Sequence, residues 1–104
     1  VDQYPNTVYA KDARRRMMYL KNVMAEYQLN ISEYYYTRKA YVASLARAKE
    51  IIVHYPRTTS VKPALELMYF SYKALDLFKY ADQINLVYQA NYGEKLNGKV
   101  HSKY

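Results

Sequence analysis

The stretch that decides the fold is residues 8–37, VYAKDARRRMMYLKNVMAEYQLNISEYYYT. No glycine or proline interrupts it, and its apolar residues recur at alternating gaps of three and four, the spacing of one helix face. These residues are Ala10, Ala13, Met17, Leu20, Met24, Tyr27, Ile31 and Tyr34. At about 1.5 Å per residue this helix would be about 45 Å long. We therefore expect one long helix with other helices packed along its whole apolar face.

The composition favours a helical protein with aromatic layers. Hydrophobic residues make up 51% of the 104 residues, enough for a core, while two glycines and three prolines leave room for few turns. The 15 tyrosines suit stacked helices, because a tyrosine ring can be buried while its hydroxyl reaches water. Cysteine is absent, which excludes disulfides and thiolate metal sites. The sequence contains no run of eighteen apolar residues, so it predicts no membrane-spanning helix.

Three further helices are expected, over residues 40–55, 60–76 and 78–91. Pro56 ends the first of them, Pro63 is tolerated in the first turn of the second, and Gly93 ends the third. Residues 1–92 would then hold all the helices. Residues 93–104 form a polar tail that we expect to be frayed.

An internal repeat organises these helices. Tyr-Pro-Asn-Thr at residues 4–7 recurs as Tyr-Pro-Arg-Thr at residues 55–58. At the same offset Lys11 matches Lys62, Ala13 matches Ala64 and Met17 matches Met68. An apolar helix, this tetrapeptide and a further helix pair are typical of an α-solenoid. We predict an all-α fold, a solenoid of tetratricopeptide-like antiparallel helix pairs with about four helices.

Several ordered pieces of the chain resemble one protein family. They are YPNTVYAKDA at 4–13, MMYLK at 17–21, AEY at 25–27, EYY at 33–35, RKAYVA at 38–43, HYPRT at 54–58 and ALELM at 64–68. Their order and spacing resemble the C-terminal half of the BamD family, the ComL-type outer-membrane assembly lipoproteins of Gram-negative bacteria. The chain begins without Met or a signal peptide, so we expect a piece of a longer protein.

The resemblance implies a non-catalytic scaffold of the outer-membrane β-barrel assembly machine. Its implied partners are the barrel-proximal POTRA domain of BamA, with BamE and BamC as further partners. The implied location is the periplasmic face of the outer membrane, with membrane contact only through a lipid anchor outside these residues. The alternative from the residues is a generic tetratricopeptide adaptor that binds a peptide or an acidic partner.

Six residues are candidates for partner binding. The resemblance implies that Arg47 faces BamA, where a guanidinium could pair with a carboxylate in bidentate fashion; the alternative is an ordinary solvated arginine. Arg14 and Arg15 lie in a basic run that is either a solvated face or a contact for an acidic partner or phospholipid headgroups. The remaining candidates lie near the end of the long helix: Tyr36, Arg38 and Lys39. In the resembled family a glycine is common where Lys39 stands.

Neither catalysis nor a cofactor is expected. His54 and His101 have no partner at metal-ligand spacing, and no phosphate-binding glycine-rich loop is present. The net charge of +7 is compatible with weak nonspecific binding to nucleic acid, but no specific nucleic-acid site is indicated. We also expect a dimer of this chain, since preceding repeats would otherwise cover the apolar side of the long helix.

Overall fold

A computed structural model describes residues 8–93 and Leu96, with side chains from Ala10 onward. It contains four helices and, within these residues, no strand. The helices are α1 (Val8–Thr37), α2 (Tyr41–His54), α3 (Val61–Ala74) and α4 (Phe78–Tyr92). The all-α class with a long first helix is thus confirmed. None of these helices has the combination of length and hydropathy that crossing a membrane requires.

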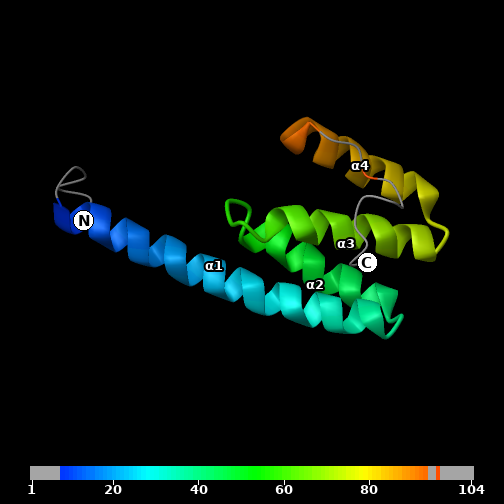
Figure 1. Cartoon of the computed structure of the whole chain (residues 1–104), viewed down its shortest axis with the longest axis horizontal. Coiled ribbons are helices and arrows are strands. Elements are labelled where there is room, and N and C mark those ends of the chain that lie inside the picture. The colour runs from blue at the N-terminus through cyan, green and yellow to red at the C-terminus, as the bar shows by residue number, and fades with distance from the viewer. Residues whose placement is uncertain (1–7, 94–95, 97–104) are drawn as a thin grey trace.

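The helices stack in chain order. Each packs against the next, and α3 also contacts α1, so that α3 lies between α2 and α4 (Figure 1). The N-terminal part of α1 extends well beyond the helices that follow it (Figure 1). We call this part, residues 10–24, the overhang. The molecule is consequently elongated, with extents of 51 × 28 × 21 Å.

The turn between α1 and α2 is tight and carries an unusual residue. Lys39 has a φ of 62°, in the left-handed region that glycine normally occupies. Its N–H donates to the Tyr36 carbonyl at 3.0 Å, and the N–H of Ala40 donates to the Tyr35 carbonyl at 2.9 Å. This is the Schellman motif that closes a helix C-terminus. The turn therefore forms without a glycine.

The turn between α3 and α4 uses the same motif. Asp76 has a φ of 60°, and the N–H of Leu77 donates to the Tyr72 carbonyl at 2.9 Å. Aspartate adopts this conformation more readily than lysine because its short polar side chain can bond locally. Gly93, at a φ of 71°, ends α4 as expected.

Small residues form the contact between α1 and α2. Ser32 and Ser44 are fully buried, and each hydroxyl donates to the other residue's carbonyl, at 2.8 and 2.9 Å. Side chains this short let the two backbones approach closely. The first core cluster continues from this contact toward α3. It comprises Ala25, Ala48, Ile51, Ala64 and Met68.

The predicted apolar face of α1 is therefore wrong over most of its length. Leu20 is 58% exposed, Tyr27 is 65% exposed, and Tyr34, expected in the core, is also exposed. The other exposed members of that face are Met17 and Met24. Helix α2 packs on the face with small residues instead, and it reaches only the C-terminal half of α1 (Figure 1). The large apolar side chains consequently lie at the surface.

A second core cluster holds α3 and α4 together. It comprises Leu65, Tyr69, Ala81, Tyr88 and Leu96. At its edge the Tyr88 hydroxyl donates to a buried carboxylate oxygen of Glu66 at 2.8 Å. Leu96 corrects the expectation of a frayed tail, because its side chain is buried and its N–H donates to Asn85 Oδ1 at 2.8 Å. Apart from Gly93, the rest of the tail lies outside the described residues.

Candidate protein-binding surface

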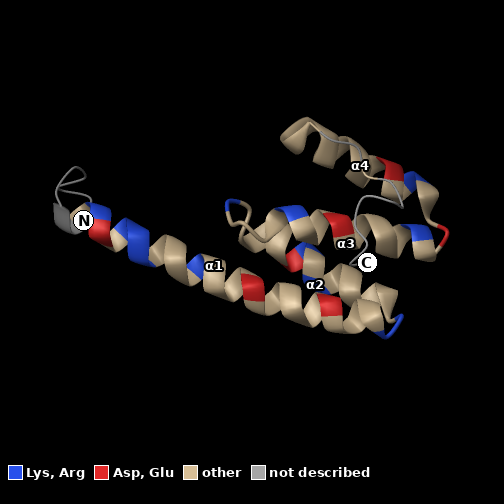
Figure 2. Cartoon of the chain, viewed as in Figure 1, with Lys and Arg blue, Asp and Glu red and all other residues tan. Residues whose placement is uncertain are grey.

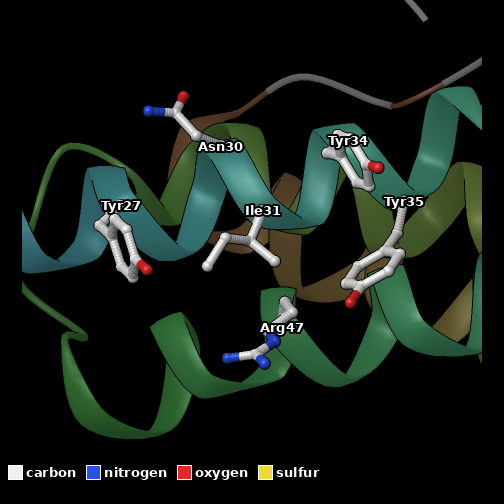
Figure 3. A pocket seen from close by; sticks show the side chains of 6 residues that line it. All are labelled: Tyr27, Asn30, Ile31, Tyr34, Tyr35 and Arg47. Atoms are coloured by element: carbon white, nitrogen blue, oxygen red, sulfur yellow. The ribbon is translucent and has the colours of Figure 1, made fainter.

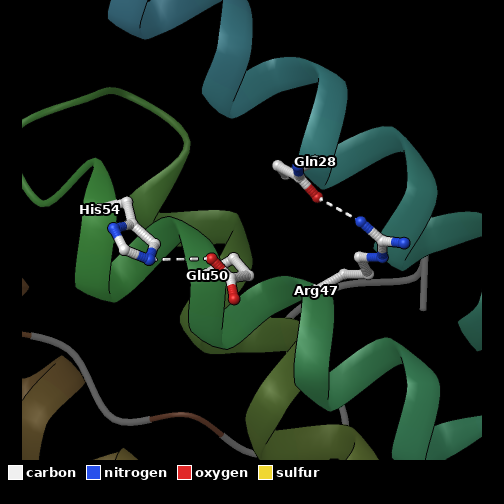
Figure 4. A network of polar contacts seen from close by, with 4 residues as sticks. All are labelled: Gln28, Arg47, Glu50 and His54. Atoms are coloured by element: carbon white, nitrogen blue, oxygen red, sulfur yellow. Dashed lines mark hydrogen bonds and ion pairs between the residues drawn. The ribbon is translucent and has the colours of Figure 1, made fainter.

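Arg47 lies on α2 where this helix faces α1. It is half-buried, and its Nη1 donates to Gln28 Oε1 of α1 at 3.2 Å (Figure 4). The guanidinium has five N–H donors in a planar fork, so this bond leaves most of the fork available to a partner. Gln28 thereby holds Arg47 in place while leaving its capacity for a bidentate contact.

A hollow of about 530 Å³ lies beside Arg47. We call it the Arg47 hollow, and its lining residues are Tyr27, Asn30, Ile31, Tyr34, Tyr35 and Arg47. Figure 3 shows Ile31 and Tyr35 of α1 directed toward the α2 side, where Arg47 reaches into the same space. The surface therefore combines an apolar and aromatic wall with one cation, a composition that is enriched at the centres of protein interfaces.

Arg38 does not line this hollow but stacks on Tyr34, which does. Its guanidinium carbon lies 3.7 Å from the centroid of the Tyr34 ring, a cation–π contact. The Tyr34 ring in turn meets Tyr35 edge-on, with centroids 5.6 Å apart. The stacked arginine and the edge-on tyrosine fix the orientation of a ring that is otherwise exposed. Arg38 thus supports the aromatic wall and adds a second cation to it.

Tyr36 and Lys39 lie elsewhere around the helix end. Tyr36, expected to be available for a surface contact, is half-buried and meets Tyr41 of α2 edge-on at 5.5 Å. Burial raises the pKa of the Tyr36 phenol, and the neighbouring Tyr41 adds to this. Lys39 is exposed in the turn. Neither lines the Arg47 hollow.

Arg14 and Arg15 lie on the overhang, and both are exposed. The helix rise places Arg14 about 20 Å from Tyr27, the nearest lining residue of the Arg47 hollow along α1. Their neighbour Arg16 pairs with Asp12 at 3.0 Å. Of the six candidates, the structure therefore brings only Arg47 and Arg38 together at one surface.

Sequence reasoning missed part of this surface. Tyr27 and Ile31 were assigned to the buried stripe of α1, and Asn30 was not considered. The available signal was the pair Ala25 and Ser32, seven residues apart, because small side chains at this spacing mark a face where another helix approaches closely. The large residues beside them then remain on the surface.

The described residues offer no candidate metal site. They contain no group of three or more potential metal ligands. His54 contacts Glu50 one turn earlier, with 3.0 Å between Nε2 and Oε2 (Figure 4). Both side chains are more than half exposed, so this is a surface ion pair whenever the histidine is protonated.

Comparisons with known proteins agree with the family expected from the sequence. The family model YfiO, described as an outer membrane lipoprotein, matches residues 1–86. The outer membrane protein assembly factor BamD of Vibrio cholerae is 36% identical over 91 residues, which cover 88% of this chain and 38% of that protein. The BamD proteins of Xylella fastidiosa Temecula1 and Neisseria gonorrhoeae are each 35% identical; the matches cover 100% and 88% of this chain and 36% and 34% of those proteins.

The chain thus spans a little over a third of the length of the curated relatives that it matches. The family-model match nevertheless extends over most of the chain, from residue 1 through α3 and into α4. The chain belongs to the YfiO family of outer membrane lipoproteins.

Proposed function

We propose that this chain is a non-catalytic scaffold in outer-membrane protein assembly, and that the Arg47 hollow docks the barrel-proximal POTRA domain of BamA. The observation that carries the proposal is the position of Arg47, a half-buried cation beside an aromatic hollow. The names of the relatives, outer membrane protein assembly factors, support the process. The full-length protein would act at the periplasmic face of the outer membrane.

The composition of the hollow defines what the docked surface must present. Arg47 requires a carboxylate placed so that both oxygens meet the guanidinium fork. The wall formed by Tyr27, Ile31 and Tyr35 requires an apolar side chain next to that carboxylate. Binding energy would come mainly from the apolar contact, and the ion pair would fix the orientation of the partner.

The other candidates have secondary roles in this proposal. Arg38 contributes through its stacking on Tyr34, and Lys39 extends the positive charge past the helix end. Tyr36 contributes by packing the helix end against Tyr41. Arg14 and Arg15 lie on the overhang, about 20 Å along α1 from Tyr27 for Arg14, and do not line the hollow. BamE, and BamC if it binds, would use surfaces away from the Arg47 hollow.

A binding titration against the barrel-proximal POTRA domain tests the proposal. Arg47→Glu reverses the charge at the hollow and is expected to weaken binding about a hundredfold or more, because it places a carboxylate opposite the partner's carboxylate. Lys49→Glu is the matched control, since Lys49 is an exposed cation of the same helix that does not line the hollow. It makes the same change in net charge and is expected to leave affinity within about threefold.

Both titrations are performed at low and at physiological salt. Binding that depends on Arg47 should largely persist as salt rises, because a partly buried pair is screened less than exposed charges. Equal losses for the two variants would show that only general charge attracts the domain. In that case, or if the unchanged chain does not bind, the proposed docking role is wrong.

A further inference from the structure

A second hollow lies where the α2–α3 turn meets the overhang. Its volume is about 240 Å³. Its lining residues are Met18, Lys21, His54, Tyr55, Pro56, Arg57 and Thr58. Two cations thus come from parts of the chain that are far apart in sequence, and no acidic residue is among the described residues of the lining. We call this the Lys21–Arg57 hollow.

The two cations are not neutralised by acidic residues of the described structure. Neither Lys21 nor Arg57 forms an ion pair with another described residue. Both side chains are exposed. The carboxylate that contacts a lining residue, Glu50, pairs with His54 and does not itself line the hollow. The hollow therefore carries a net positive charge.

Hydrogen bonds fix the two sides of the hollow relative to each other. The N–H of Thr59 donates to Asn22 Oδ1 at 3.1 Å, which joins the α2–α3 turn to α1 next to Lys21. Within the turn, the Thr58 hydroxyl donates to the Tyr55 carbonyl at 2.8 Å. Arg57 lies between Tyr55 and Thr58, within the segment that this second bond closes. The backbone positions that carry the cations are consequently preorganised, which lowers the entropic cost of binding a ligand.

We propose that the Lys21–Arg57 hollow binds a phosphate group. A lysine ammonium and an arginine fork both bind phosphate, the first as a point charge and the second in bidentate fashion. A tetrahedral phosphate directs oxygens toward two walls at once, whereas the two oxygens of a carboxylate lie in one plane. Met18 and Pro56 provide apolar surface for the organic part of a phosphate ester.

The surroundings favour a phosphate on a lipid surface over one in solution. Lys and Arg gather on the N-terminal half of α1 and recur in the α2–α3 turn (Figure 2). Arg14 lies two helical turns before Lys21 and therefore on the same side of α1. This basic path extends the charge beyond the hollow, as contact with several headgroups would require. The proposal is independent of the Arg47 hollow, which lies on α2 and the C-terminal half of α1.

Two titrations of the 104-residue chain test the site. The first follows backbone amide NMR shifts at residues 21 and 57–59 during addition of inorganic phosphate at constant ionic strength. The second measures co-sedimentation with vesicles of phosphatidylcholine alone and of phosphatidylcholine with one quarter phosphatidylglycerol. The test variant is Lys21→Gln/Arg57→Gln. The matched control is Lys49→Gln/Lys79→Gln, which removes the same charge from exposed positions of α2 and α4.

We expect saturable shifts with phosphate. The dissociation constant for phosphate should rise about tenfold or more in the test variant and less than about twofold in the control. Vesicle binding that needs phosphatidylglycerol and fails only in the test variant identifies a lipid headgroup as the source. Phosphate binding without vesicle binding identifies a phosphate in solution. Absent shifts, or equal losses in both variants, would overturn the proposal. A short glutamate peptide that binds more tightly than phosphate would overturn it too, because the hollow would then select carboxylates.

Discussion

Lys39 has a backbone conformation that is sterically unfavourable for a residue with a side chain. A left-handed φ brings Cβ close to the following carbonyl, at a cost of about 1–2 kcal/mol for a residue other than glycine. The Schellman hydrogen bonds of the α1–α2 turn hold it there. Asp76 is in the same conformation with a smaller penalty.

We predict that Lys39→Gly stabilises the chain by about 1 kcal/mol, because glycine removes the clash at the cost of some additional entropy in the unfolded chain. Urea denaturation followed by circular dichroism measures the change. Asp76→Gly should raise the free energy of unfolding by a smaller amount. Lys49→Gly, in the middle of α2, should lose about 1 kcal/mol. If Lys39→Gly were as destabilising as Lys49→Gly, the assignment of strain to this turn would be wrong.

The paired hydroxyls of Ser32 and Ser44 make a second prediction at this scale. Ser32→Ala should cost about 1–2 kcal/mol, because it removes one hydrogen bond and leaves the buried Ser44 hydroxyl with fewer partners. The double variant Ser32→Ala/Ser44→Ala should cost clearly less than the sum of the single variants. Urea denaturation of the four proteins gives the coupling energy. Strictly additive losses would mean that the two hydroxyls do not act as a pair.

The sequence predicted the candidate residues at this scale only in part. Arg47 was found through a resemblance, and Arg38 through its position near the helix end. Tyr27 and Ile31 were assigned to the core because side-chain character alone favours burial of large apolar residues. Tyr27 is exposed and Ile31 is only half-buried, because burial depends on which face α2 covers, and that is decided by packing between residues distant in sequence.

At the scale of the helices, periodicity predicted their number and approximate extent. It did not predict which face of α1 is buried, because two stripes satisfy the helical period: one of large apolar residues and one of small residues that includes Ala25 and Ser32. Close packing favoured the small-residue stripe. Val42 of α2 shows the same limitation, because this apolar residue is 70% exposed.

The position of Leu96 leads to a prediction at this scale. Polar neighbours indicated a frayed tail, yet this one apolar side chain is buried against α3 and α4. Leu96→Ala should cost about 2 kcal/mol or more, because it removes a buried side chain and leaves a cavity. Leu86→Ala, at an exposed position of α4, should change stability by less than about 0.5 kcal/mol. Thermal unfolding distinguishes the two, and equal effects would argue against burial of Leu96 on α3 and α4.

At the scale of the whole molecule, a row of large apolar side chains is exposed along the overhang and the helical turn that follows it. These are Met17, Leu20, Val23, Met24 and Tyr27. A contiguous apolar surface of this kind favours association. The internal repeat points the same way, since Met68, the counterpart of Met17, is buried in the core cluster that joins α1, α2 and α3.

We predict that the isolated chain self-associates through this row. Leu20→Gln/Met24→Gln should shift sedimentation equilibrium toward the monomer, with a dimer dissociation constant raised about tenfold or more. Val42→Gln/Leu86→Gln removes comparably exposed apolar side chains from other surfaces and serves as the control. A monomer at every concentration, or equal shifts in both variants, would contradict the prediction.

The continuity of α1 has a mechanical consequence. Hydrogen bonds hold this helix to α2 through the paired serines and to the α2–α3 turn through Asn22. The part of α1 before Asn22 extends beyond these contacts without support from the other described helices. From Asn22 to Ala10 this part is about 18 Å long, so a tilt of about 5° at Asn22 displaces its end by about 1.5 Å. A partner that binds the N-terminal end of α1 therefore acts on the contacts made by Asn22 and Ser32. A tilt caused there is transmitted along the same continuous helix to Tyr27 and Ile31.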